Sequence, residues 1–145
     1  ELGLEVTKSR IGDVLKDQGS ELEKIKEPIE KYVGAPLGSG KQWQSWIHLS
    51  DLAAIFHHVM EKRLEGVFNA VSPNPVNNKE LTECIADRLE KPLILPNVPA
   101  FVLKLMLGEM STIVLGSQLV SSKKILSTGF KFEYAQLKPA IADLL

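Results

Sequence analysis

The chain has 145 residues, which is enough for one hydrophobic core of ordinary size. Its composition, 44% hydrophobic and 24% charged, is typical of a globular domain, and its net charge of −1 gives no electrostatic reason to expect nucleic acid or an anionic membrane as a partner. The single cysteine, Cys84, excludes a disulfide or a paired-cysteine zinc site within these residues, so a reducing, cytoplasmic location is expected.

The first part of the chain alternates helical and extended patterns. Residues 1–4 resemble the end of a helix, and residues 5–11 show the partial alternation of a strand. Helical spacing follows over residues 21–33, where Pro28 is expected to kink or divide the helix. A chain that starts in this way is expected to enter in mid-fold.

The stretch 38–52 combines a glycine-rich turn, an aromatic strand and a helix start. Ser50 or Asp51 is expected to cap this helix by accepting hydrogen bonds from its free N–H groups. Residues three apart on a strand face opposite sides, so one of Trp43 and Trp46 is expected in the core and the other at a cavity; two core tryptophans are an equal alternative. This stretch is the candidate rim of a pocket.

The rest of the chain continues the rhythm of an α/β fold. Apolar residues recur at helical spacing from residue 52 to 60, a strand is predicted over 67–71, and Asn77 with Glu80 forms the pattern of a capping box. Cys84 is expected to be a buried, unreactive thiol. Further elements are predicted as helices over 99–107, 108–115, 122–129 and 136–145, and as a short strand over 130–132.

Motifs for phosphate or metal binding are weak. The glycine-rich segment 34–41 departs from a P-loop, because Ala35 and Gln42 stand where a glycine and a hydroxyl are needed. His57 and His58 would point about 100° apart on a helix, and His48 is distant in sequence. No metal site is therefore expected.

Four segments together resemble the C-terminal half of an extended short-chain dehydrogenase/reductase, and the most specific is Gly38 to Leu52 together with residues 107–110. The chain is similar in particular to the nucleoside-diphosphate-sugar epimerase-like branch, some members of which are labelled cell-division inhibitors and end in a small domain of unknown function. The four segments are residues 10–15, 38–52, 66–75 and 127–132.

The resemblance implies an α/β fold: the C-terminal, substrate-binding part of an NAD(P)-binding Rossmann-type fold, with short strands and several helices. Residues 1–90 would form the epimerase-like part and residues 91–145 a small helical domain. It also implies a parent protein about twice as long, since no glycine-rich dinucleotide turn follows a strand here. Tyr134 and Lys138 have the spacing of the family's catalytic pair but lie outside its context. No catalytic residue is expected here.

The resemblance also assigns site residues, and it implies NAD or NADP in the parent only. Ile11, Gly12 and Asp13 would lie next to the cofactor. The substrate-pocket candidates are Gln42, Trp43, Trp46 and His48, although His48 could equally be a structural histidine bonded to the next helix. Gln44 stands where related enzymes tend to place an arginine for the diphosphate, and glutamine cannot neutralise a phosphate charge.

The function implied is the substrate-binding part of an NAD(P)-dependent nucleoside-diphosphate-sugar epimerase or reductase, inactive alone. Hydride would pass between nicotinamide and a carbinol or carbonyl carbon of a small-molecule substrate. The alternatives are a non-catalytic protein-interaction module and an isolated domain without a ligand. Without its partner half, the chain would expose apolar surface, so self-association is expected.

Overall fold

The computed structural model describes residues 7–145, and the helix end expected at residues 1–4 lies outside this range. In the described range the strands form three two-stranded sheets. β1 (Thr7–Ile11) pairs in parallel with β5 (Gly66–Ala70), β2 (Asp13–Leu15) pairs in parallel with β4 (Trp46–His48), and β3 (Trp43–Gln44) pairs antiparallel with β6 (Val76–Asn77). The mixed α/β architecture agrees with the fold class predicted from the sequence.

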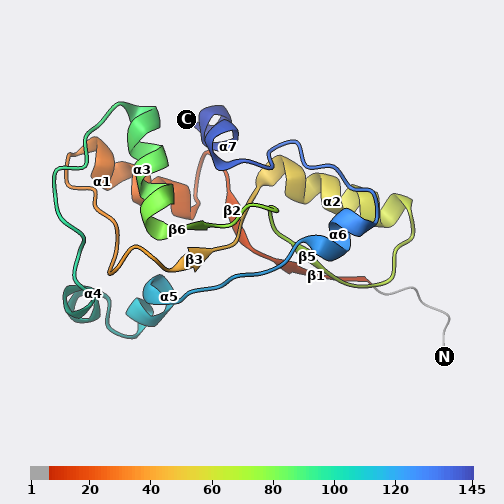
Figure 1. The fold of residues 1–145 in the computed structure, drawn as a ribbon, viewed down its shortest axis with the longest axis horizontal. Coiled ribbons are helices and arrows are strands. Elements are labelled where there is room, and N and C mark those ends of the chain that lie inside the picture. Colours follow the sequence, from red (N-terminus) through yellow and green to blue (C-terminus); the bar gives the residue numbers. More distant parts are fainter. Residues whose placement is uncertain (1–6) are drawn as a thin grey trace.

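Helices surround these short sheets on several sides (Figure 1). The predicted helix at 21–33 is α1, which ends three residues early and passes through Pro28 without dividing. The predicted strand at 130–132 is wrong, because Phe130 and Phe132 pack edge to face, with ring centroids 4.9 Å apart, and pair with no strand. The helices are α1 (Glu21–Glu30), α2 (Leu49–Glu61), α3 (Asn78–Leu89), α4 (Ala100–Leu107), the 3-10 turn η1 (Gly108–Met110), α5 (Ser111–Leu115), α6 (Lys123–Ser127) and α7 (Leu137–Leu144).

Two hydrophobic clusters hold the molecule together, toward opposite ends of its long axis (Figure 1). One lies among α1, α3 and α7 and is centred on Trp46, Ile85 and Ile141. The other lies among α2, β5 and α6 and is centred on Ile47 and Ile55. Neighbouring residues of β4 thus enter different clusters, as expected for a strand whose side chains alternate between faces. Both clusters combine residues from either side of the 90–91 boundary, which stays a prediction.

The ends of two helices show how local chemistry positions the chain. The capping box at α3 is confirmed: Asn77 Oδ1 accepts from Glu80 N, and a Glu80 carboxylate oxygen accepts from Asn77 N. The prediction for α2 is wrong, because His48 is its N-cap and accepts from Ser50 N at 3.0 Å. Asp51 is instead buried and accepts from the backbone N–H groups of residues 133 and 134.

Candidate functional site

The chain passes from the first parallel sheet to the second at Gly12. Gly12 N donates to Ala70 O at 3.2 Å, and Asp13 N donates to Ser45 O at 2.8 Å. A Cβ on Gly12 would lie 2.3 Å from Ser45 O and 2.7 Å from Val71 Cγ1, so a side chain does not fit without movement. Gly12 therefore brings the β1–β2 junction against the β3–β4 junction.

Ser45, between β3 and β4, fastens a distant segment to this junction. Its buried Oγ donates to Gln118 O at 3.1 Å and accepts from Val120 N at 3.0 Å. Trp43 makes two further bonds to the same segment, since its O accepts from Gln118 N and its N donates to Ser117 Oγ. Residues 116–122, which join α5 to α6 in Figure 1, thus form a wall beside the strands.

Two cavities flank this wall, and Gln118 lines both. The first, here named the Asp13 cavity, has a volume of about 340 Å³. The second, here named the Arg10 cavity, has a volume of about 440 Å³. The Asp13 cavity is lined by Asp13, Trp43, Gln44, Thr112, Ile113, Gly116 and Gln118, and the Arg10 cavity by Arg10, Ile11, Gly12, Ser45, Asn69, Val71 and residues 118–121.

The structure brings the three cofactor candidates together, but on different sides of the wall. Ile11 and Gly12 line the Arg10 cavity, where the Ile11 side chain is 50% exposed. Asp13 lines the other cavity. Arg10 makes no ion pair among residues 7–145, so its guanidinium offers a positive charge to the cavity named after it.

The substrate candidates separate into one cavity residue and three buried ones. Trp43 is 40% exposed and lines the Asp13 cavity, whereas Trp46 is 1% exposed in the core and donates from Nε1 to Asn74 O at 2.8 Å. The division of the two tryptophans between cavity and core is as predicted. Gln42 is buried and donates from Nε2 to Leu37 O at 3.0 Å, and it lines neither cavity.

His48 is held on every side. Its Nδ1 accepts from Ser50 N, so the ring proton lies on Nε2 and is donated to Asp143 Oδ2 at 2.9 Å. Its ring stacks on Tyr134, with centroids 4.0 Å apart. These contacts are those of the structural histidine bonded to the next helix that the sequence left as an alternative, and His48 lines neither flanking cavity.

The Asp13 cavity contains two polar groups in unusual settings. Gln44 Oε1 is buried and has no hydrogen-bond partner among the described residues. Asp13 is exposed, but partial desolvation by its neighbours raises the pKa of its carboxyl, and the negative charge of Glu21 raises it further. Both groups can accept a hydrogen bond, and no lysine, arginine or histidine is among the described residues lining this cavity.

The sequence did not indicate three residues that line the cavities, Ser45, Thr112 and Gln118. Ser45 was placed inside a continuous strand, and Gln118 follows a helix in a segment with no periodic pattern. The available signal was weak: Gly116 and four polar residues interrupt the apolar sequence over residues 116–122. Their role depends on contacts across more than 70 residues, which local patterns do not record.

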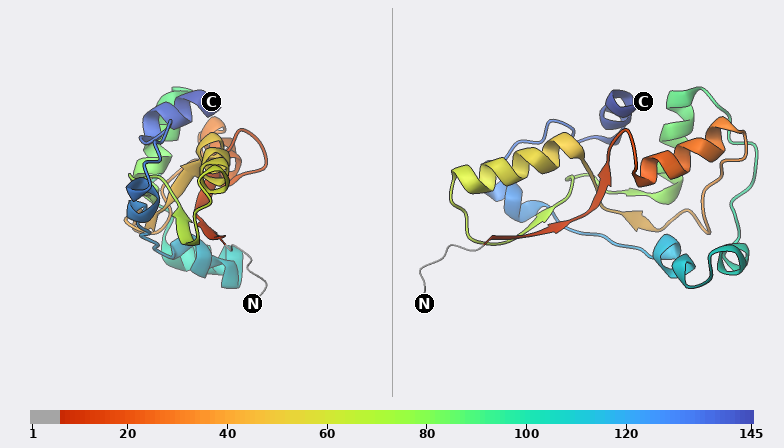
Figure 2. Two further views of the ribbon diagram at one scale, coloured as in Figure 1. Left: turned by 90° about the vertical axis from the view of Figure 1, so that its right-hand side faces the viewer. Right: turned by 180° about the vertical axis from the view of Figure 1, so that it is seen from behind.

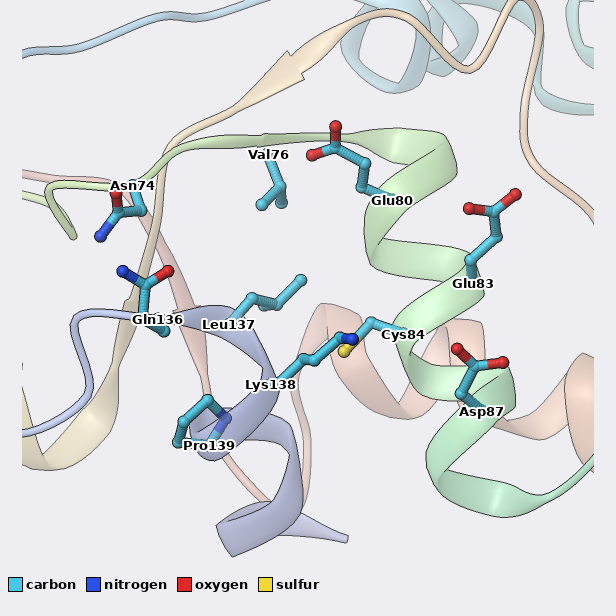
Figure 3. A pocket seen from close by; sticks show the side chains of 10 residues that line it. All are labelled: Asn74, Val76, Glu80, Glu83, Cys84, Asp87, Gln136, Leu137, Lys138 and Pro139. Carbon is cyan, nitrogen blue, oxygen red and sulfur yellow. The ribbon is translucent and has the colours of Figure 1, made fainter.

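A larger cavity of about 610 Å³ lies between α3 and α7 and shares no lining residue with the other two (Figure 3). Cys84 of α3 and Lys138 of α7 face each other across it. Burial raises the pKa of the Cys84 thiol, although the positive charge of Lys138 acts in the opposite direction. The thiol is half-buried, and its raised pKa is that of the unreactive cysteine expected from the sequence.

Two features are absent from the described residues: a cluster of metal-binding side chains and a helix able to span a membrane. Within residues 7–145, no three His, Cys, Asp or Glu side chains gather as they would to bind a metal ion. No helix in the same range is both long and apolar enough to cross a membrane.

Comparison with known proteins shows what the sequence and the fold are similar to. A family model described as a domain of unknown function, DUF1731, matches residues 98–144. An epimerase family protein of Staphylococcus aureus (strain MRSA252) is 40% identical over 146 residues, covering 100% of this chain and 48% of that protein. The chain thus spans about half the length of the curated relatives it matches.

Solved structures give the same result. The crystal structure of human epimerase family protein SDR39U1 with NADPH has a TM-score of 0.87 and 29% identity, over 95% of this chain and 47% of that chain. The nucleoside-diphosphate sugar epimerase from Corynebacterium glutamicum has a TM-score of 0.73 and 26% identity, over 97% of this chain and 26% of that chain.

Fold and sequence both fit the C-terminal part of an extended short-chain dehydrogenase/reductase. Within that class, the chain is similar to epimerase family proteins, as the bacterial and the human relatives are both named. The human relative was solved with NADPH, so a nicotinamide cofactor occurs among its structural relatives.

Proposed function

We propose that this chain supplies the substrate side of an NAD(P)-dependent epimerase or reductase, whose dinucleotide-binding part lies outside these 145 residues. The observation that supports this most is the position of the Arg10 cavity. β1 and β5 are parallel and end at Ile11 and Ala70, where the Arg10 cavity opens. In open α/β sheets, ligands bind outside the carboxyl ends of parallel strands.

The free edge of β1 also supports the proposal. Among the described residues β1 pairs only with β5, although parallel sheets are normally larger and covered on both faces. The backbone N–H and C=O groups on the far side of β1 are thus available to a further strand. A Rossmann sheet continued by the rest of the parent protein would satisfy them.

The residues of the Arg10 cavity fit the nicotinamide end of a dinucleotide. Ile11 and Val71 present apolar surface to a flat ring, Gly12 allows close approach of the backbone, and Arg10 offers a positive charge. When bound, the dinucleotide would supply the hydride acceptor or donor. The work of this chain would be to bind the substrate beside it and to hold the reacting carbon in place.

The test is a titration of the longer parent protein, which includes these 145 residues, with NADH and with NADPH. The longer protein is expected to bind a dinucleotide, and this chain alone is expected not to. Ile11→Glu, in the Arg10 cavity, should weaken binding about tenfold or more by placing a carboxylate beside an anionic ligand. Ile94→Glu, at an exposed position that lines neither cavity, is the matched control and should have no effect.

A longer protein that binds no dinucleotide, or equal binding by the two variants, would contradict the proposal.

A second candidate, a protein-interaction module, is favoured by apolar side chains exposed on neighbouring elements. These side chains belong to α4, η1 and α5. Figure 1 and the right-hand view of Figure 2, which are seen from opposite sides, both place α4 and α5 at one corner of the molecule. The exposed side chains are Phe101, Leu105, Met106, Met110 and Ile113. A second copy of the chain is the partner proposed for this surface.

A further inference from the structure

We infer that the Asp13 cavity binds a neutral ligand rich in hydroxyl groups and without a phosphate, with Gln44 Oε1 as its main acceptor. The inference deepens the proposed function by naming the class of substrate. Only the reaction that this substrate would undergo rests on the proposed function; the binding does not. Its starting point is the unpartnered amide oxygen of Gln44.

A buried oxygen without a hydrogen bond is costly, so a buried acceptor that persists calls for a partner. Gln44 lies on β3, where the main chain is fixed by its pairing with β6. In this position no donor among the described residues reaches Oε1. A ligand hydroxyl that donates to Oε1 would satisfy it.

The other polar groups of the cavity require donors as well. Asp13 has a carboxyl that accepts hydrogen bonds, and Thr112 Oγ1 already donates to Glu109 O at 2.7 Å, which leaves its lone pairs free. A phosphate brings acceptors and negative charge, so it would face Asp13 without a cation to offset the repulsion. Arg10 lines the other cavity and is not among the residues that line this one.

Trp43 and the size of the cavity define the shape of the ligand. The half-exposed indole offers a flat apolar surface, against which the C–H face of a saturated ring can pack. A volume of about 340 Å³ lies at the small end of ligand pockets. One polyhydroxylated ring fits these conditions, and a carbinol carbon on that ring is the group that hydride chemistry needs.

The experiment uses the 145-residue chain and a panel of monosaccharides and inositols, each paired with its monophosphate. Binding is followed by the NMR shifts of the Trp43 indole N–H and the Gln44 side-chain amide. The neutral member of at least one pair is expected to shift both signals and to bind about tenfold or more tighter than its phosphate. Gln44→Met should weaken that binding by a similar factor, because the acceptor is lost.

Two further variants sharpen the result. Gln44→Arg is expected to reverse the preference toward the phosphorylated member. Gln18→Met makes the same chemical change at an exposed turn and should leave binding unchanged. Unfolding curves of every variant identify any that fail to fold, and then the preference of the wild-type chain alone decides.

Three results would overturn the inference. They are tighter binding of the phosphates by the wild-type chain, an unchanged affinity in a folded Gln44→Met variant, and no shift at either signal with any member of the panel. The last would assign an ordered water to Gln44 Oε1. Dinucleotide binding by the longer protein is measured separately. The proposed function can therefore stand when this inference fails, and this inference can stand when the proposed function fails.

Discussion

Ser45→Ala should release the wall that separates the two cavities. The Ser45 hydroxyl is the one group that both donates to and accepts from residues 118–120, and it is buried. Removing it leaves Gln118 O and Val120 N without these partners. The backbone of Trp43 would still hold residues 117 and 118, so the segment should loosen mainly at Val120.

The expected loss of stability follows from those two bonds. A buried hydrogen bond contributes about 0.5–1.5 kcal/mol, and a group left unsatisfied costs roughly 1–3 kcal/mol. Gln118 and Leu119 are exposed, so water can reach part of the released segment and reduce the cost. A loss of about 2 kcal/mol in the free energy of unfolding is therefore expected.

Urea unfolding measures the stability, and amide hydrogen exchange at Val120 measures the local opening. Ser127→Ala is the matched control, because that exposed hydroxyl bonds only to Lys124 O within its own helix turn. Its effect should stay within about 0.5 kcal/mol. If Ser45→Ala leaves both the free energy and the exchange at Val120 unchanged, the wall is not held by Ser45, and the account of the two cavities is wrong.

Three further predictions follow from the same structure. Gly12→Ala should cost about 1–3 kcal/mol in urea unfolding, since its Cβ would meet Ser45 O and Val71; an unchanged stability would mean that the junction is loosely packed. Because the pKa of Asp13 is raised, the folded state binds a proton more tightly than the unfolded state does. The free energy of unfolding of the wild type, relative to that of Asp13→Asn, should therefore fall as pH rises from about 4 toward neutrality. A difference that stays constant with pH would refute this. The 83% exposed Leu105 should contribute to self-association, so Leu105→Glu should sediment as a smaller species than wild type at high concentration, and identical sedimentation would exclude this surface.

Local patterns in the sequence predicted much of the fold. The capping box of α3 and the apolar spacing of α2 depend on residues three or four apart, and both elements lie where they were expected. The bond from His48 to the next helix was one of two alternatives, whereas the position of Asp51 was not predicted, because its partners are backbone groups 82 and 83 residues further along the chain.

The candidate site could be predicted only in part. Ile11, Gly12, Asp13 and Trp43 were identified by resemblance, and the structure places all four at the two cavities. The wall of residues 116–122 was not identified, since it is irregular and its bond from Val120 to Ser45 spans 75 residues. The roles of these residues in binding stay predictions.

The central claim is that the carboxyl end of β1 lies against the nicotinamide in the parent protein. The most direct measurement is the nuclear Overhauser effect between nicotinamide ring protons and the Ile11 methyl groups in the longer protein, labelled at isoleucine methyls and saturated with dinucleotide. A cross-peak to Ile11, with none to the distant exposed Ile94, is expected. A bound dinucleotide whose ring gives no cross-peak to Ile11 would contradict the account.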